Sequence, residues 1–124
     1  MSQAEFTCTV VPQFLEEQSN PAQREYVFAY TVTIVNSGSV TGQLIGRHWV
    51  ITDATDSTQE VRGLGVIGQQ PTLKPGERFE YTSWTRLETP HGIMQGTFYC
   101  VTEDVTTFEA PIAPFSLARA QSLH

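Results

Sequence analysis

The sequence predicts an all-β sandwich of about seven strands, folded as a single domain over residues 1–124. Apolar and polar side chains alternate with a period of two over several stretches, and these stretches are rich in β-branched and aromatic residues. Turn signals built from Gly, Pro, Asn and Asp separate the stretches. Hydrophobic residues make up 40% of the 124 residues, which is enough for one sizeable core.

The first two strands are expected at residues 5–14, "EFTCTVVPQF", and 26–36, "YVFAYTVTIVN". The second has the clearer alternation, with a core face made of Tyr26, Phe28, Tyr30, Val32 and Ile34. Residues 13–25 between the strands are expected to form a long polar loop, because Pro21 breaks any helical turn there.

A turn at residues 36–39, "NSGS", leads into a third strand that runs from Val40 into "RHWVITDA". In this strand Trp49 and Ile51 alternate with His48, Val50 and Thr52. The polar stretch 53–59, "DATDSTQ", is typical of a turn, and "EVRG" after it predicts a short fourth strand.

Three more strands are predicted in the second half. "LKPGE" (73–77) should form a turn with Gly76 at positive φ, and 78–86 should follow as a strand with Phe79, Tyr81 and Ser83 on one side. A strand over 93–103 follows the turn 89–92, "TPHG". The last strand, 107–112, should be stopped by two prolines, Pro111 and Pro114. The final residues, 117–124, should fray or form a short turn.

Residues 63–68, "GLGVIG", fit the G-x-G-x-x-G pattern of dinucleotide-binding folds. That site also needs a helix after the glycines, and "QQPTLKPGE" leaves no room for one. The pattern therefore predicts a bend or bulge with Val66 and Ile67 packed inward. The alternative is a loop that binds an anion or a partner through backbone amides, with Gly63, Gly65 and Gly68 as its candidate residues. The nearby cations are Arg62, Lys74 and Arg78.

Charge excludes several classes of partner. Thirteen acidic and seven basic residues give a net charge of −6, so nucleic acid and anionic membranes would repel the protein. No apolar run is long enough to span a bilayer, and the first residues do not resemble a signal peptide. We therefore expect a cytoplasmic protein that binds neither nucleic acid nor membrane.

No residue pattern indicates a catalytic or metal centre, and we expect no catalytic residues, no metal and no cofactor. The three histidines are not at metal-ligand spacing: His48, His91 and His124. A hard-cation site at Asp53, Asp56 and Glu60 is the weaker alternative, because Asp is a usual turn residue. Two cysteines, Cys8 and Cys100, are expected to be reduced and buried.

The aromatic residue of most functional interest is Trp84. If Tyr81 and Ser83 face the core, alternation points Trp84 outward, where with Arg86 and His48 it would offer a surface for a protein partner. The alternative, burial of Trp84 between loops by sheet twist, is equally compatible with the sequence.

Four stretches together resemble the ApaG family, also called CorD: "RHWVITDA", "VRGLGVIGQQPTLKPGERFEYTS", "LETPHGIMQGTFYC" and "FEAPIAPFSL". The resemblance covers nearly the whole chain, with an ordered core of about 5–117, and implies an immunoglobulin- or fibronectin type III-like sandwich. It also implies a link to cobalt resistance and magnesium efflux without an established enzymatic activity.

Two functions follow. The first is a non-enzymatic module that binds an unidentified protein, with a homodimer also possible. The alternative is a small-ligand or ion-responsive protein that binds a pyrophosphate, a phosphorylated nucleotide or a divalent cation.

Overall fold

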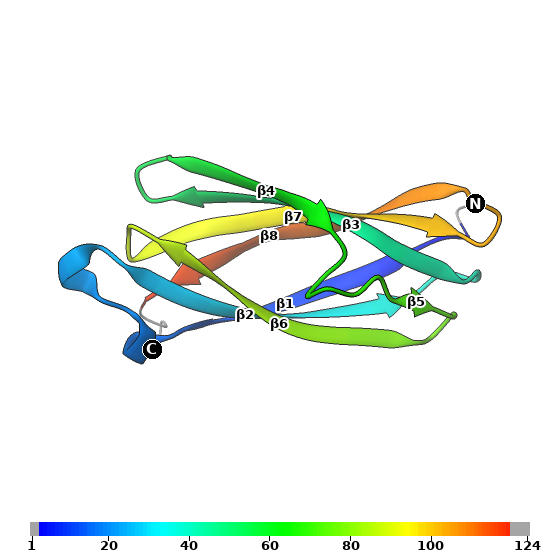
Figure 1. Cartoon of the computed structure of the whole chain (residues 1–124), viewed down its shortest axis with the longest axis horizontal. Coiled ribbons are helices and arrows are strands. Elements are labelled where there is room, and N and C mark those ends of the chain that lie inside the picture. Colours follow the sequence, from blue (N-terminus) through cyan, green and yellow to red (C-terminus); the bar gives the residue numbers. More distant parts are fainter. Residues whose placement is uncertain (1–2, 120–124) are drawn as a thin grey trace.

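The structure, a computed structural model that describes residues 3–119, consists of two antiparallel β-sheets packed face to face (Figure 1). One sheet has the order β1-β2-β6, from β1 (Phe6–Phe14), β2 (Tyr26–Asn36) and β6 (Arg78–Leu87). The other has the order β4-β3-β7-β8, from β3 (Gly42–Asp53), β4 (Thr58–Leu64), β7 (His91–Thr102) and β8 (Thr107–Ala118). A two-residue strand, β5 (Thr72–Leu73), pairs with the start of β3. The predicted immunoglobulin- or fibronectin type III-like sandwich is confirmed.

The core lies between the sheets, where alternation predicts it. All five residues of the predicted core face of β2 are buried. Trp49 of β3 is 2% exposed, and its ring centroid lies 5.4 Å from that of Tyr30, 6.0 Å from Phe98 and 6.3 Å from Phe115. Because these rings come from both sheets, the indole of Trp49 joins the two layers.

The prediction that prolines stop the last strand is wrong, because β8 continues through Pro111 and Pro114 to Ala118. β8 is the edge of its sheet and pairs only with β7. An edge strand can hold a proline because only one of its sides makes ladder hydrogen bonds. The register also shifts at this point, between Met94 and Gly96 of β7.

The segment between β1 and β2 is also more ordered than a polar loop. It contains two 3-10 turns, Glu16–Gln18 and Pro21–Gln23. Pro21 opens the second turn instead of breaking a helix, because its fixed φ suits the first position of a helical turn. The turn predicted around Gly76 is confirmed, with φ +87° and a 2.9 Å hydrogen bond from Glu77 N to Lys74 O.

Toward the C-terminus, Leu117 and Ala118 belong to β8, and the rest of the predicted turn over 117–124 lies outside the described residues from 120 on. Across residues 3–119, the structure contains no helix with the length and apolar character of a membrane span.

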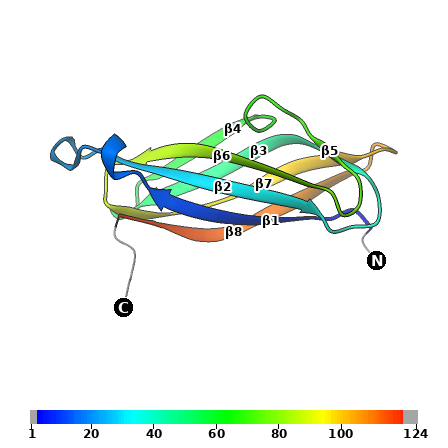
Figure 2. The ribbon, with the colours of Figure 1, turned by 90° about the horizontal axis from the view of Figure 1, so that it is seen from below.

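The two long sides of the sandwich differ (Figure 2). Along one side β1 and β8 pack against each other, whereas β4 and β6, which border the other side, do not pack together to a comparable extent. The segment between β4 and β5, which contains Gly65 and Gly68 of the glycine pattern, lies on this second side (Figure 2). We call this side, bordered by β4, β6 and the 64–69 loop, the open edge.

Candidate functional site

The open edge holds an arginine that faces the interior, and a β-bulge in β3 places it there. On a regular strand, two residues an odd number of positions apart point to opposite faces, yet Leu44 and Trp49 are both buried. The register with β7 shifts between Leu44 and Gly46, which marks the bulge. The bulge reverses which residues point inward. Arg47 therefore shares the inner face with Trp49, whereas an unbroken strand would have turned Arg47 to solvent.

The 64–69 loop, which we call the glycine loop, is a tight turn. Val66 and Gln69 exchange backbone hydrogen bonds of 2.8 and 2.9 Å, and the two residues between them, Ile67 and Gly68, have φ values of +43° and +79°. Positive φ at both central positions defines a type I′ turn. Val66 is buried as predicted, but the prediction for Ile67 is wrong: it is 54% exposed because it occupies the tip of the turn.

Each glycine of the pattern has its own structural reason. A Cβ on Gly63 would lie 2.8 Å from both terminal nitrogens of Arg47. Gly65 has φ +67°, and a Cβ there would lie 2.5 Å from Gln69 O. Gly68 has a positive φ, but a Cβ there would meet no other heavy atom within 4 Å. The residues after Gly68 form the turn and β5, with no helix up to Arg119, so no helix N-terminus faces this loop.

Arg47 is bound to this loop. Its Nη1 donates hydrogen bonds of 2.9 Å to the carbonyl oxygens of both Leu64 and Gly65. The guanidinium lies beside a cavity of about 280 Å³ whose polar lining is completed by Tyr30, Tyr81 and Ser83. The cation in contact with the glycine loop is thus Arg47, which sequence reasoning missed in favour of Arg62, Lys74 and Arg78.

The two phenols beside Arg47 stay protonated at neutral pH. Burial raises the pKa of Tyr81 and of Tyr30, and this outweighs the Arg47 charge, which lowers both pKa values. A hydrogen bond with Ser83 also lowers the pKa of Tyr30. The pocket therefore combines one fixed positive charge with hydroxyl groups that can donate hydrogen bonds.

Trp84 lies on the outer face of β6 and is 66% exposed, so the outward alternative is the one that the structure adopts. It is paired with Ala29 of β2, and Arg86 with Val27. A surface groove of about 1000 Å³ runs past Trp84 and Arg86 and reaches β4. The groove is lined by Leu15, Gln18, Glu25, Val27, Ala29, Gln59, Val61, Thr82, Ser83, Trp84, Thr85 and Arg86. Arg86 Nη1 lies 3.4 Å from a carboxylate oxygen of Glu25.

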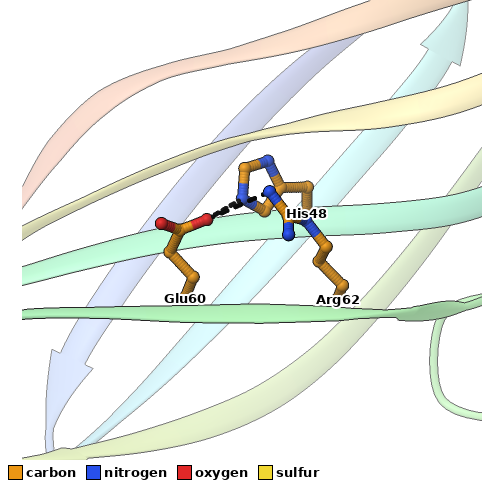
Figure 3. Close-up of polar contacts among 3 residues, drawn as sticks. All are labelled: His48, Glu60 and Arg62. Carbon is orange, nitrogen blue, oxygen red and sulfur yellow. Dashed lines mark hydrogen bonds and ion pairs between the residues drawn. The ribbon is translucent and has the colours of Figure 1, made fainter.

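His48 does not join this surface. It lies on the other sheet and points away from the core, because its neighbour Trp49 points inward. Its Nε2 lies 2.8 Å from Glu60 Oε1, and Arg62 Nη2 lies 3.2 Å from the same oxygen (Figure 3). The structure therefore places Trp84 and Arg86 together and separates His48 from them.

The hydrogen bond to His48, with a smaller contribution from the Arg62 charge, lowers the pKa of Glu60. A lowered folded-state pKa means that this contribution to stability is present above the ordinary glutamate pKa and is lost as the pH falls through the lowered value. We expect His48→Ala to raise the pKa of Glu60 and to reduce that acid-dependent loss. NMR titration of the Glu60 side chain measures the shift. Arg62→Ala is the control and should raise it less, and an unchanged pKa in His48→Ala would contradict the contact.

The remaining candidate groups are the carboxylates of the 53–59 turn and the two cysteines. Asp53 Oδ1 accepts hydrogen bonds from the amides of Thr55 and Ser57, as a turn residue does. Within residues 3–119, no three His, Cys, Asp or Glu side chains gather as a metal site would require. Cys8 and Cys100 are free thiols, and burial raises the pKa of each to about 12.

Comparison with known proteins identifies close relatives. The model of the ApaG domain matches residues 16–102. The chain is 56% identical to Protein ApaG of Ralstonia nicotianae over 124 residues, which is all of both proteins. It is 57% identical to Protein ApaG of Bordetella pertussis over 120 residues, covering 97% of this chain and 92% of the relative. A crystal structure of the putative ApaA protein from Bordetella pertussis superposes with a TM-score of 0.93 at 55% identity, covering 96% and 97% of the two proteins.

Proposed function

The chain belongs to the ApaG domain family, and from this premise we propose that it is a non-enzymatic protein-interaction module whose docking surface is the open edge. The observation that carries the proposal is Trp84. A tryptophan that is 66% exposed on a regular strand contributes little to the core of this protein. Tryptophan is also among the residues most enriched at the energetic centres of protein interfaces.

The surroundings of Trp84 support an interface. Leu64 and Ile67 on the glycine loop are 76% and 54% exposed, and they lie at the same open edge. Ser83 of β6 lines both the Arg47 pocket and the groove past Trp84, so the two features are continuous. Exposed apolar side chains around a groove with a polar border are the composition expected of a docking surface.

The occupant that fits is an extended segment of a partner protein. Strand β6 is ten residues long and pairs only with β2, so its other side has no ladder partner among the described strands. An extended segment can add to such an edge through backbone hydrogen bonds. Its successive side chains would then point alternately to the inner and the outer face of the β1-β2-β6 sheet. On this proposal the partner is a cytoplasmic protein, and the link to cobalt resistance and magnesium efflux that the family resemblance implies would be an indirect effect exerted through that partner.

The test uses crosslinking followed by direct binding. A photoreactive amino acid in place of Thr82, on β6, should capture one protein from the native extract, and the same amino acid in place of Tyr99, on β7, should not. The captured protein is then purified, and its affinity is measured by calorimetry. We expect Trp84→Ala to weaken binding by about tenfold or more, because the loss of a central interface tryptophan costs roughly 2 kcal/mol.

The matched control is Tyr99→Ala, which removes an aromatic residue that is 42% exposed on the other sheet. It should leave the affinity unchanged. Equal weakening by both variants would contradict the open edge as the docking surface. Capture of a second copy of this protein would contradict a different protein as the partner and support the homodimer.

A further inference from the structure

Arg47 carries a positive charge that no carboxylate among the described residues neutralises. The ion pairs within residues 3–119 are His48–Glu60, Arg62–Glu60 and Arg86–Glu25, so Arg47 has no carboxylate within 4.0 Å in that part of the protein. Its side chain is half-buried. A partly desolvated guanidinium without a counter-ion costs free energy, and an anion in the pocket would remove that cost.

The guanidinium is also held in a fixed position. Both hydrogen bonds to the loop carbonyls come from Nη1, so Nη2 and Nε have no partner within the described residues. Gly63 allows this arrangement because any larger residue would press a Cβ against the guanidinium. A planar donor group whose position is set in advance loses little conformational entropy when it binds an oxyanion.

The other groups of the pocket fix the kind of anion. Arg47 supplies one positive charge, and no second Lys or Arg lines the cavity within the described part of the protein. Protonated Tyr81 and the hydroxyl of Ser83 add neutral donors on the opposite wall. A volume of about 280 Å³ with a single cation matches one carboxylate, whereas a nucleoside polyphosphate carries several charges and a base that need a larger site.

From this geometry, we propose that the Arg47 pocket binds a single carboxylate group, presented by the partner segment that pairs with β6. The position of the pocket supports this source, because Tyr81 and Ser83 belong to β6 itself, and a strand added to β6 would pass the mouth of the cavity. The inference rests on the proposed function only for the source of the carboxylate, which is either an acidic side group or the terminal carboxylate of the partner.

The site is tested first without a partner. The full-length protein is titrated with acetate, and with acetamide as the uncharged match, while NMR follows the Arg47 Nε–H and Gly65 amide signals. Acetate should give saturable shifts and acetamide none. Arg47→Met should abolish the acetate shift of the Gly65 amide, and Ser83→Ala, which leaves the loop contacts intact, should weaken acetate binding by about fivefold. Arg62→Met removes an exposed arginine from the outer face and should change nothing.

Three results would overturn the proposal. The first is the absence of saturable acetate shifts, and the second is an unchanged acetate shift of the Gly65 amide in Arg47→Met. The third is tighter binding of pyrophosphate or ATP than of acetate at the same signals, which would make the pocket a phosphate site.

The source of the carboxylate is tested on the segment captured at the open edge. The Asp and Glu residues of the segment are converted to amides in one version, and its C-terminus is amidated in another. The version that removes the bound carboxylate should bind the protein about tenfold more weakly, and the two changes should have no effect on binding to the Arg47→Met variant. A captured segment whose affinity is insensitive to both changes would overturn the partner as the source. Because the acetate titration does not involve Trp84, a failure of the pocket and a failure of the docking surface can be told apart.

Discussion

Replacing Trp49 with alanine is expected to remove roughly 3–5 kcal/mol from the free energy of unfolding, the largest effect of any substitution considered for this protein. The indole is 2% exposed and contacts aromatic rings from both sheets. Its removal leaves a cavity between the layers that neighbouring rings on regular strands can fill only in part. For a domain of this size, whose total stability is about 5–15 kcal/mol, such a loss can leave much of the protein unfolded.

Urea denaturation followed by far-UV circular dichroism measures the effect, and the second tryptophan is a control of the same chemistry. Trp84→Ala removes an equally large side chain from a site that is 66% exposed, and should change stability by no more than about 0.5 kcal/mol. Trp49→Phe keeps an aromatic ring between the sheets and should cost less than Trp49→Ala. Similar losses for Trp49→Ala and Trp84→Ala would contradict the assignment of Trp49 to the core and of Trp84 to the surface.

The second large effect concerns the glycine pattern. Gly65→Ala is expected to cost roughly 3 kcal/mol, since a left-handed conformation and a forced contact each add about 1–2 kcal/mol. The forced contact is with Gln69 O, only 2.5 Å from the added Cβ. Gly68→Ala should cost only about 1 kcal/mol, because its positive φ of +79° is strained for alanine but the surrounding space is open.

Asparagine separates the two causes. It tolerates a left-handed conformation better than alanine does, so Gly68→Asn should be close to neutral, whereas Gly65→Asn keeps the collision with Gln69 and should remain costly. Thermal unfolding by calorimetry compares the four variants. Equal costs at both positions would mean that conformation alone, and not the packing of the loop, selects glycine at residue 65.

The sequence was sufficient for most of the strand plan. In β2, alternation identified five of the six buried side chains, and the sixth, Asn36, lies on the same face, because nothing interrupts the period of two along this strand. The turn at Gly76 was predicted equally well, since proline followed by glycine fits one turn type. The end of β8 was predicted wrongly, because a proline stops a central strand but not an edge strand, and the position of a strand in its sheet is a property of the whole fold.

The sequence by itself determined that this is a two-layered β-protein and that its glycine pattern is not followed by a helix, and it left Trp84 either outward or buried between loops. These conclusions depend on neighbours in the sequence. Only the tertiary structure decided that Arg47 hydrogen-bonds to the glycine loop, that Gly63 leaves room for its guanidinium and that His48 lies on the other sheet from Trp84. The physical reason is that each of these arrangements depends on strands that are distant in sequence, and the bulge between Leu44 and Gly46, which sets the faces of β3, is likewise fixed by pairing with β7.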